Sequence, residues 1–241
     1  MQGKVIIIEG SIGAGKSNFA QELSSALTDI SGKPCKILIE PSTEDEIGGP
    51  NPYLSDYYSN PSRWAFAMQC HLLQERLRMH ISAQYYVMAG EGHAVIDRSF
   101  YGDVAFLELQ KRDGHLDNRE YYTYHRLYEI MTSFVKLPTI CVRLLVSSDV
   151  AQDRIKRRAE EISGRRCEEV INIGYLERLN EEIEFVCFHL SQGGVEIINE
   201  HWNQNRGSME DRQEAIRALA RHIHKLPIST RPKELHLRRI S

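Results

Sequence analysis

Short apolar runs alternate along the chain with longer segments of helical periodicity. Runs rich in β-branched residues predict strands at 5–8, 36–39, 94–96, 140–146 and 195–198. Apolar residues at helical spacing predict helices at roughly 16–29, 62–90, 118–135, 148–161, 174–190 and 209–224. The strand segments are apolar at nearly every position, as expected for strands buried on both faces of a parallel sheet. The pattern therefore predicts an α/β fold, a five-stranded parallel sheet flanked by helices.

Composition narrows the class of protein. The 241 residues are 41% hydrophobic and 26% charged, which excludes a mainly disordered chain and a collagen-like repeat. The net charge of −3 gives no overall positive field that would attract nucleic acid. We therefore expect small molecules, rather than nucleic acid, as partners.

The N-terminus and the cysteines bear on location. A strand-like run begins at Lys4, which leaves no room for a signal peptide, and no apolar stretch reaches the ~18 residues of a membrane span. The five cysteines are an odd, scattered set without a C-x-x-C pair, which is typical of reduced thiols. A cytoplasmic protein with no membrane partner is expected.

A phosphate-binding loop follows the first predicted strand. The pattern G-x-x-x-x-G-K-[ST] is matched by Gly10, Ser11, Ile12, Gly13, Ala14, Gly15, Lys16 and Ser17. Its glycines allow backbone N–H groups to surround phosphates at the start of a helix. Lys16 is expected to reach the β- and γ-phosphates of ATP, and the Ser17 hydroxyl to bind Mg²⁺. The motif predicts the three-layer P-loop NTPase fold.

Polar residues end the second and third predicted strands. Glu40 follows the second strand, and Asp97 and Arg98 end the third. Carboxyl ends of parallel strands border the ligand crevice, so Glu40 is placed to act as a general base on a hydroxyl. Asp97 is a candidate Mg²⁺ ligand, and Arg98 is placed to bind either a phosphate or Glu40.

The long helix at 62–90 carries an unusual amide. Gln69 lies on an otherwise apolar face, and a buried carboxamide needs a partner. A carboxamide can form two hydrogen bonds to the edge of a nucleobase.

In order, these motifs resemble the deoxyribonucleoside kinase family, from Lys4 to about Asn199. The resemblance rests on the P-loop, Glu40-Pro41, the run Tyr58-x-x-Pro61-x-Arg63-Trp64-x-Phe66-x-x-Gln69, Asp97-Arg98-Ser99 and Asp103. It implies that Glu40 is the general base, Tyr58 contacts the sugar 3′-hydroxyl and Gln69 binds the base. It also implies that Arg76 and Asp103 pair beside the base, and that Arg98 orients Glu40.

The family has an arginine-rich lid that closes over the phosphates, and the resemblance places it at about 154–172. It implies catalytic roles for Arg158 and Arg166. Glu161 or Glu169 would be a second 3′-hydroxyl contact, and the spacing to Tyr175-Leu176 favours Glu169. Residues 1–225 would form a single kinase domain and 226–241 a C-terminal tail. A homodimer built on the helices near 62–90 and 118–135 is also implied.

The expected function is transfer of the ATP γ-phosphate to the 5′-hydroxyl of a deoxynucleoside in nucleotide salvage. A purine nucleoside is expected, because the charged pair of Arg76 and Asp103 leaves no apolar space for a 5-methyl group. One alternative acceptor is a nucleoside monophosphate or a base in DNA, although Arg76 is the only extra cation near Gln69. Another alternative is a nucleotide-switched binding protein, which would leave the Tyr58–Gln69 pattern without a purpose.

Overall fold

The computed structural model describes residues 3–40, 51–203 and 208–227. Pro41 and most of the predicted tail, 228–241, lie outside these ranges. Five parallel strands form one sheet in the order β2-β3-β1-β4-β5. The strands are β1 (Val5–Glu9), β2 (Lys36–Leu38), β3 (Ala94–Asp97), β4 (Ile140–Leu145) and β5 (Glu196–His201). The predicted five-stranded parallel sheet is confirmed.

Burial across the sheet follows the apolar pattern. All five residues of the central strand β1 are buried, and Ile6, Ile7 and Ile8 have no exposed surface. The edge strands β2 and β5 contain no buried residue and carry more polar side chains. The apolar central strands thus fix the position of the loops that follow β1 and β3.

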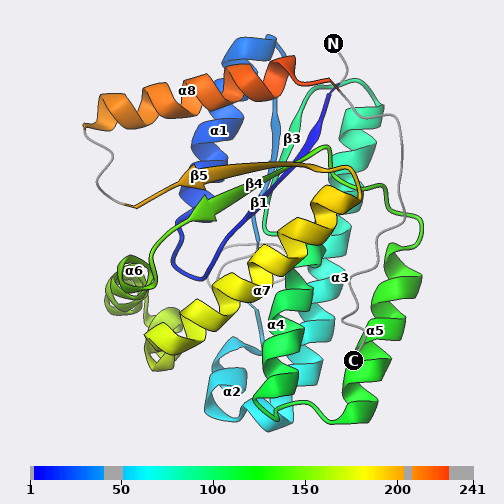
Figure 1. Cartoon of the computed structure of the whole chain (residues 1–241), viewed down its shortest axis with the longest axis vertical. Helices are drawn as coiled ribbons and strands as arrows, with labels where there is room; N and C mark the ends of the chain where they lie inside the picture. Colours follow the sequence, from blue (N-terminus) through cyan, green and yellow to red (C-terminus); the bar gives the residue numbers. More distant parts are fainter. Residues whose placement is uncertain (1–2, 41–50, 204–207, 228–241) are drawn as a thin grey trace.

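Helices cover both faces of the sheet and give three layers (Figure 1). They are α1 (Lys16–Ser31), α2 (Leu54–Ser59), α3 (Pro61–Met88), α4 (Phe100–Arg112), α5 (Asn118–Thr132), α6 (Ser148–Glu161), the 3₁₀ helix η1 (Ser163–Val170), α7 (Ile173–Gln192) and α8 (Met209–Lys225). Helices α1 and α8 pack together on one face, and α3, α4 and α7 lie on the other, with α5 against α3 (Figure 1). Across the described ranges, no helix is both long and apolar enough to span a membrane.

Helix α4 is absent from the prediction, which left 100–112 without an element. The sequence signal is weak because ten of its thirteen residues are buried, so no polar stripe marks a solvent face. By contrast, α3 starts with Pro61 after the Asn60 cap, and α8 starts with the capping box of Ser208 and Asp211. Such start signals make the amphipathic helices predictable.

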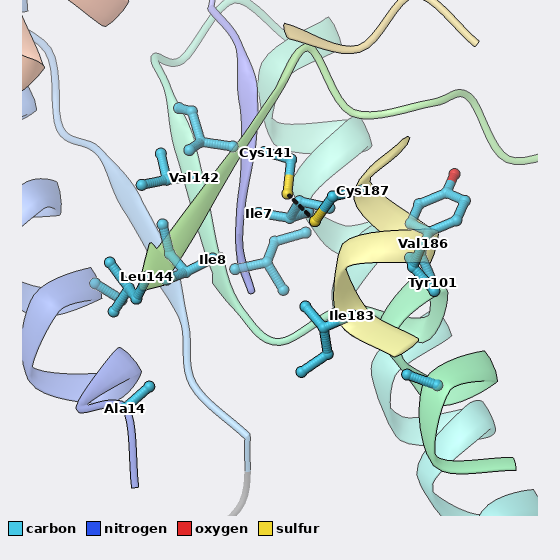
Figure 2. Packing of buried hydrophobic residues seen from close by; sticks show 14 of the residues in the cluster. Ile7, Ile8, Ala14, Tyr101, Cys141, Val142, Leu144, Ile183, Val186 and Cys187 are labelled. Carbon is cyan, nitrogen blue, oxygen red and sulfur yellow. Dashed lines mark hydrogen bonds between the residues drawn. The ribbon is translucent and has the colours of Figure 1, made fainter. Parts of the chain in front are cut away.

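The core between the sheet and α7 is shown in Figure 2. Ile7 from β1 and Cys141 from β4 face Ile183 and Cys187 from α7, and all four are buried. The Cys141 and Cys187 sulfur atoms lie 4.0 Å apart as free thiols. This packing anchors the sheet on which the site is built.

Candidate active site

The loop between β1 and α1 has the backbone that phosphate binding requires. Gly13 and Gly15 have φ of 78° and 84°, values that favour glycine. A Cβ on Gly13 would lie 2.4 Å from the Ala151 carbonyl oxygen, so no side chain fits there. Lys16 is buried, and its Nζ donates to the carbonyl oxygens of Gly10 (2.9 Å) and Ser11 (2.6 Å). Burial and the Arg98 cation lower the pKa of Lys16. The negative charge of a bound phosphate would oppose this effect and stabilise the protonated form of Lys16.

The residues proposed for Mg²⁺ lie together. Ser17 Oγ donates to Asp97 Oδ2 at 2.5 Å, and within the described ranges the buried Asp97 Oδ1 has no hydrogen-bond partner. A hydroxyl and a carboxylate are the oxygen donors that Mg²⁺ takes when phosphates and water complete its octahedron. The donor set and the partnerless oxygen therefore fit Mg²⁺.

Glu40 lies between two arginines. Arg76 donates to Glu40 Oε1 through Nε (3.1 Å) and Nη2 (2.5 Å), and Arg98 Nε lies 3.1 Å from Oε2. Burial alone would raise the pKa of Glu40, but the cations of Arg76 and Arg98 outweigh it and lower the pKa to about 2. Arg76 also pairs with the fully buried Asp103. The Arg76–Asp103 contact and the Arg98–Glu40 contact inferred from the resemblance are thus both present, and Glu40 is ionised at neutral pH.

A cavity of about 780 Å³ joins this carboxylate to the phosphate loop. Glu40, Tyr58, Gln69 and Arg76 line it together with Lys16. Gln69 is buried, and its Oε1 has no hydrogen-bond partner in the described part of the chain. The volume suits a small-molecule ligand, and the Gln69 oxygen is an acceptor that such a ligand would satisfy.

The arginine-rich segment forms α6 and η1 beside the cavity. Arg154 is committed to the backbone, donating to the Ala14 and Trp202 carbonyl oxygens at 3.0 and 2.9 Å. Arg158 Nη2 and Arg165 Nη1 donate to the two carboxylate oxygens of Glu168, at 2.5 and 2.8 Å. Because two arginines share one carboxylate, this cluster presents a net positive charge to the cavity.

The register of η1 differs from the expected one. Glu169 and Arg166 are exposed and do not line the cavity, whereas Arg165 and the buried Glu168 do. In the 3₁₀ helix, residues i and i+3 lie on one face, which places Arg165 beside Glu168 on the side that faces the cavity. Glu161, the alternative to Glu169, also lines the cavity.

Tyr58 faces this part of the cavity. It lines the cavity with Glu168 and Tyr175, and burial, with smaller effects from Tyr175 and Glu168, raises its pKa well above the ordinary value. The hydroxyl therefore remains protonated and able to donate. Tyr58 and Glu168 offer a donor and an acceptor to one ligand hydroxyl.

Two further features escaped the sequence interpretation. Glu9, at the end of β1, is a buried carboxylate bonded to Ser99. Arg212 from α8 stacks 4.9 Å from the Trp202 ring centre, and both line the cavity beside Gly15. Two sequence signals could have indicated these features. Glu9 is a charged residue at the end of an apolar strand, and Trp202 directly follows the last strand.

Comparison with known proteins gives a consistent result. The family described as deoxynucleoside kinase matches residues 6–226. A deoxyguanosine kinase of Dictyostelium discoideum is 31% identical over 200 residues, covering 83% of this chain and 64% of the relative, so this chain spans less than two thirds of that protein. A deoxyadenosine kinase of the same organism is 31% identical over 204 residues, covering 85% and 74%.

A solved structure shares the fold. The deoxyadenosine kinase from M. mycoides with bound dATP superposes with a TM-score of 0.67 and 25% identity. The match covers 90% of this chain and 99% of that one.

Proposed function

This chain belongs to the deoxynucleoside kinase family of phosphotransferases, and from that premise we propose that it moves the γ-phosphate of ATP to the 5′-hydroxyl of a deoxynucleoside. One observation carries the proposal. An ionised Glu40, held by Arg76 and Arg98, shares a cavity with the phosphate loop and with the partnerless amide oxygen of Gln69. The sites proposed for the acceptor hydroxyl, the nucleobase and the phosphates of the donor therefore adjoin one another in this cavity.

At the donor end, the loop N–H groups and Lys16 bind the phosphates. Ser17 and Asp97 would hold Mg²⁺, which supplies neutralisation of charge between the β- and γ-phosphates. Arg158 and Arg165 face the cavity, so we assign to them the stabilisation of the transferring group, with Arg165 taking the role expected of Arg166.

At the acceptor end, Glu40 accepts a hydrogen bond from the 5′-hydroxyl and takes its proton as the phosphoryl group is transferred. A carboxylate with a pKa of about 2 is a weak base, so its main contribution is to hold the nucleophile in line. Tyr58 and Glu168 bind the 3′-hydroxyl, and Gln69 binds the base.

A purine nucleoside is the proposed substrate. Arg76 is paired with both Glu40 and Asp103, and this buried charged group would disfavour the 5-methyl group of thymine where it borders the cavity. The two Dictyostelium relatives described above are named for deoxyguanosine and deoxyadenosine, which supports the same preference. We propose that the product enters nucleotide salvage in the cytoplasm, where the free cysteines stay reduced.

A homodimer is proposed on the outer face of the packed pair α3 and α5. Ile81, Tyr85 and Met88 form an exposed stripe on α3, and Leu127 and Ile130 form one on α5. Their spacing of three and four residues places each set on one helix face. Light scattering should give twice the chain mass for the unaltered protein and the chain mass for Ile130→Asp; a monomer in both would refute the dimer.

The activity is tested by measuring ATP consumption with each of the four deoxynucleosides and their monophosphates. Deoxyguanosine or deoxyadenosine should give the highest kcat/KM, deoxycytidine the next and thymidine the lowest. Highest activity with a monophosphate would replace the proposed acceptor. Thymidine ranking first would refute the purine assignment while leaving the kinase activity in place.

A further inference from the structure

Glu9 is a buried carboxylate that the proposed chemistry does not use. It is the last residue of β1, directly before the phosphate loop, and only 3% of its surface is exposed. Its Oε1 accepts two hydrogen bonds from Ser99, one from the backbone N–H at 3.0 Å and one from Oγ at 2.5 Å. An acidic group this deeply buried is expensive, because burial opposes its charge and raises its pKa.

Ser99 follows the residue with the most unusual backbone in the described ranges. Arg98 has φ of 67°, and no other described residue except glycine has a positive φ. This conformation is strained and persists only where the surroundings impose it. On its N-terminal side, the Arg98 N–H donates to the Ile8 carbonyl oxygen at 3.2 Å. On its C-terminal side, Glu9 holds Ser99.

Helix α4 leaves room for this carboxylate. A Cβ built on Gly102 would lie 2.6 Å from Glu9 Oε2 and 3.0 Å from Oε1. Ser99 is also the N-cap of α4, accepting from the Tyr101 N–H at 3.2 Å. Glu9 therefore joins the end of β1 to the start of α4 across the turn that contains Arg98.

We propose that Glu9 is a positioning residue: by holding Ser99, it keeps Arg98 in its strained conformation with the guanidinium against Glu40. The proposal rests on the proposed function, in which Glu40 binds the acceptor hydroxyl. Three cations face Glu40, namely Arg76 from α3, Arg98 from the turn after β3, and Lys16 from α1. Of these, Arg98 makes the contact to Oε2, whereas Arg76 contacts Oε1.

The sign of one measurement separates positioning from a direct charge effect. If Glu9 acted only as a nearby anion, its removal would favour the ionised form of Glu40 and lower the pKa of Glu40. If Glu9 holds Arg98, its removal releases a cation from Glu40 and raises that pKa from about 2 towards its ordinary value of 4.5. Opposite directions are thus expected from the two roles.

The experiment compares Glu9→Ala, Glu9→Gln and Gly102→Ala with the unaltered protein. Glu9→Gln keeps an oxygen that accepts from Ser99. Gly102→Ala keeps every charge but displaces the Glu9 carboxylate, because the added methyl group would clash with it. This variant therefore tests the same contact if Glu9→Ala does not fold. The matched control is Glu182→Ala, which removes another buried carboxylate, paired with Arg112 at 2.5 Å on the side of α4 that faces α7.

Three quantities are measured: kcat for the best deoxynucleoside, the dissociation constant of that nucleoside, and the side-chain ¹³C resonance of Glu40 between pH 7 and pH 4. In the unaltered protein that resonance should stay constant, because Glu40 remains ionised. In Glu9→Ala and Gly102→Ala it should begin to titrate, with kcat lower by about 10- to 100-fold and nucleoside affinity little changed. Glu9→Gln should restore most of kcat, and Glu182→Ala should change only thermal stability.

A Glu40 resonance that stays constant in both Glu9→Ala and Gly102→Ala would overturn the proposal, whatever the activity. Equal losses of kcat in Glu182→Ala and Glu9→Ala would also overturn it, since general destabilisation would then explain both. If the unaltered protein phosphorylates no deoxynucleoside, the proposed function fails, and the ¹³C titration still decides the role of Glu9.

Discussion

The two ends of the sheet both bury charged and polar groups, but they satisfy them differently. At the amino end, Lys4 N–H donates to His93 Nδ1 at 3.2 Å, His93 Nε2 lies 3.1 Å from His224 Nδ1, and Lys4 Nζ donates to the His224 carbonyl oxygen at 2.8 Å. At the carboxyl end, Asp97 Oδ1 and Gln69 Oε1 are buried and have no hydrogen-bond partner among the described residues. Lys4, His93 and His224 thus satisfy one another through contacts within the described chain.

The difference indicates where ligands belong. A buried polar atom without a partner costs about 1–3 kcal/mol, so a fold keeps one where a bound molecule supplies the missing bond. The Lys4, His93 and His224 network closes the junction of β1, β3 and α8 and needs nothing more. Substitutions at the carboxyl end should therefore change activity, and substitutions at the amino end should change stability.

The largest effect is expected from Lys16→Ala. The substitution removes the charge-assisted contact to the β- and γ-phosphates, so phosphoryl transfer should fall below detection. The measurement is ATP consumption with the best deoxynucleoside, and circular dichroism checks that the fold is kept. Activity near that of the unaltered protein would show that the loop is only a structural turn.

Glu40→Gln should have the next largest effect. The amide keeps the size of the side chain but cannot take the 5′ proton, and it loses the ion pairs to Arg76 and Arg98. We expect kcat to fall by about 100-fold or more, with a smaller change in nucleoside affinity. A kcat close to that of the unaltered protein would show that Glu40 is not the general base for the 5′-hydroxyl.

Helix η1 offers a matched pair of adjacent residues for testing the site. Glu168→Gln breaks the contacts to Arg158 and Arg165 at the cavity and should raise KM for the nucleoside and lower kcat together by about tenfold. Glu169→Gln changes an exposed carboxylate and should leave both constants within about twofold. A larger effect from Glu169→Gln than from Glu168→Gln would instead support Glu169, as the sequence predicts, as the contact to the 3′-hydroxyl.

Much of the carboxyl end could be predicted from sequence because it consists of local motifs. The phosphate loop, Glu40 and Asp97 each follow a strand that the apolar pattern reveals, and parallel strands bring their ends together. The orientation of the arginine-rich segment was harder to predict, because the side that a residue of η1 faces depends on whether the turn has 3.0 or 3.6 residues. The structure places Glu168 at the cavity and leaves the neighbouring Glu169 exposed.

Other features depend on tertiary packing. Helix α4 is buried on nearly all sides, so its sequence lacks the polar stripe that marks a helix. The role of Glu9 depends on Ser99, ninety positions away in the chain, and on the space above Gly102. The contact between His224 and His93 arises only when α8 folds onto the start of β3.

The smallest effect on activity, and a clear one on stability, is expected at the amino end. Burial, with help from Lys4 and His224, lowers the pKa of His93 from 6.5 to about 4. Its Nδ1 accepts from the Lys4 N–H, so protonation of that nitrogen breaks the bond. Below pH 6.5 the unfolded chain binds a proton that the folded protein resists, so stability falls as pH drops from about 6.5 towards 4.

Each such histidine contributes a slope of at most about 1.4 kcal/mol per pH unit. Burial likewise lowers the pKa of His80 to about 4, so His93→Gln should remove part of the slope and leave the part due to His80. Urea unfolding at pH 7, 6 and 5 measures how the free energy of unfolding changes with pH. The matched control is His222→Gln, which changes an exposed histidine on α8. Because His93 lies at the sheet end opposite the phosphate loop, kcat at pH 7 should stay within about twofold. An unchanged slope in His93→Gln, or the same loss in His222→Gln, would show that the amino end does not control this pH dependence.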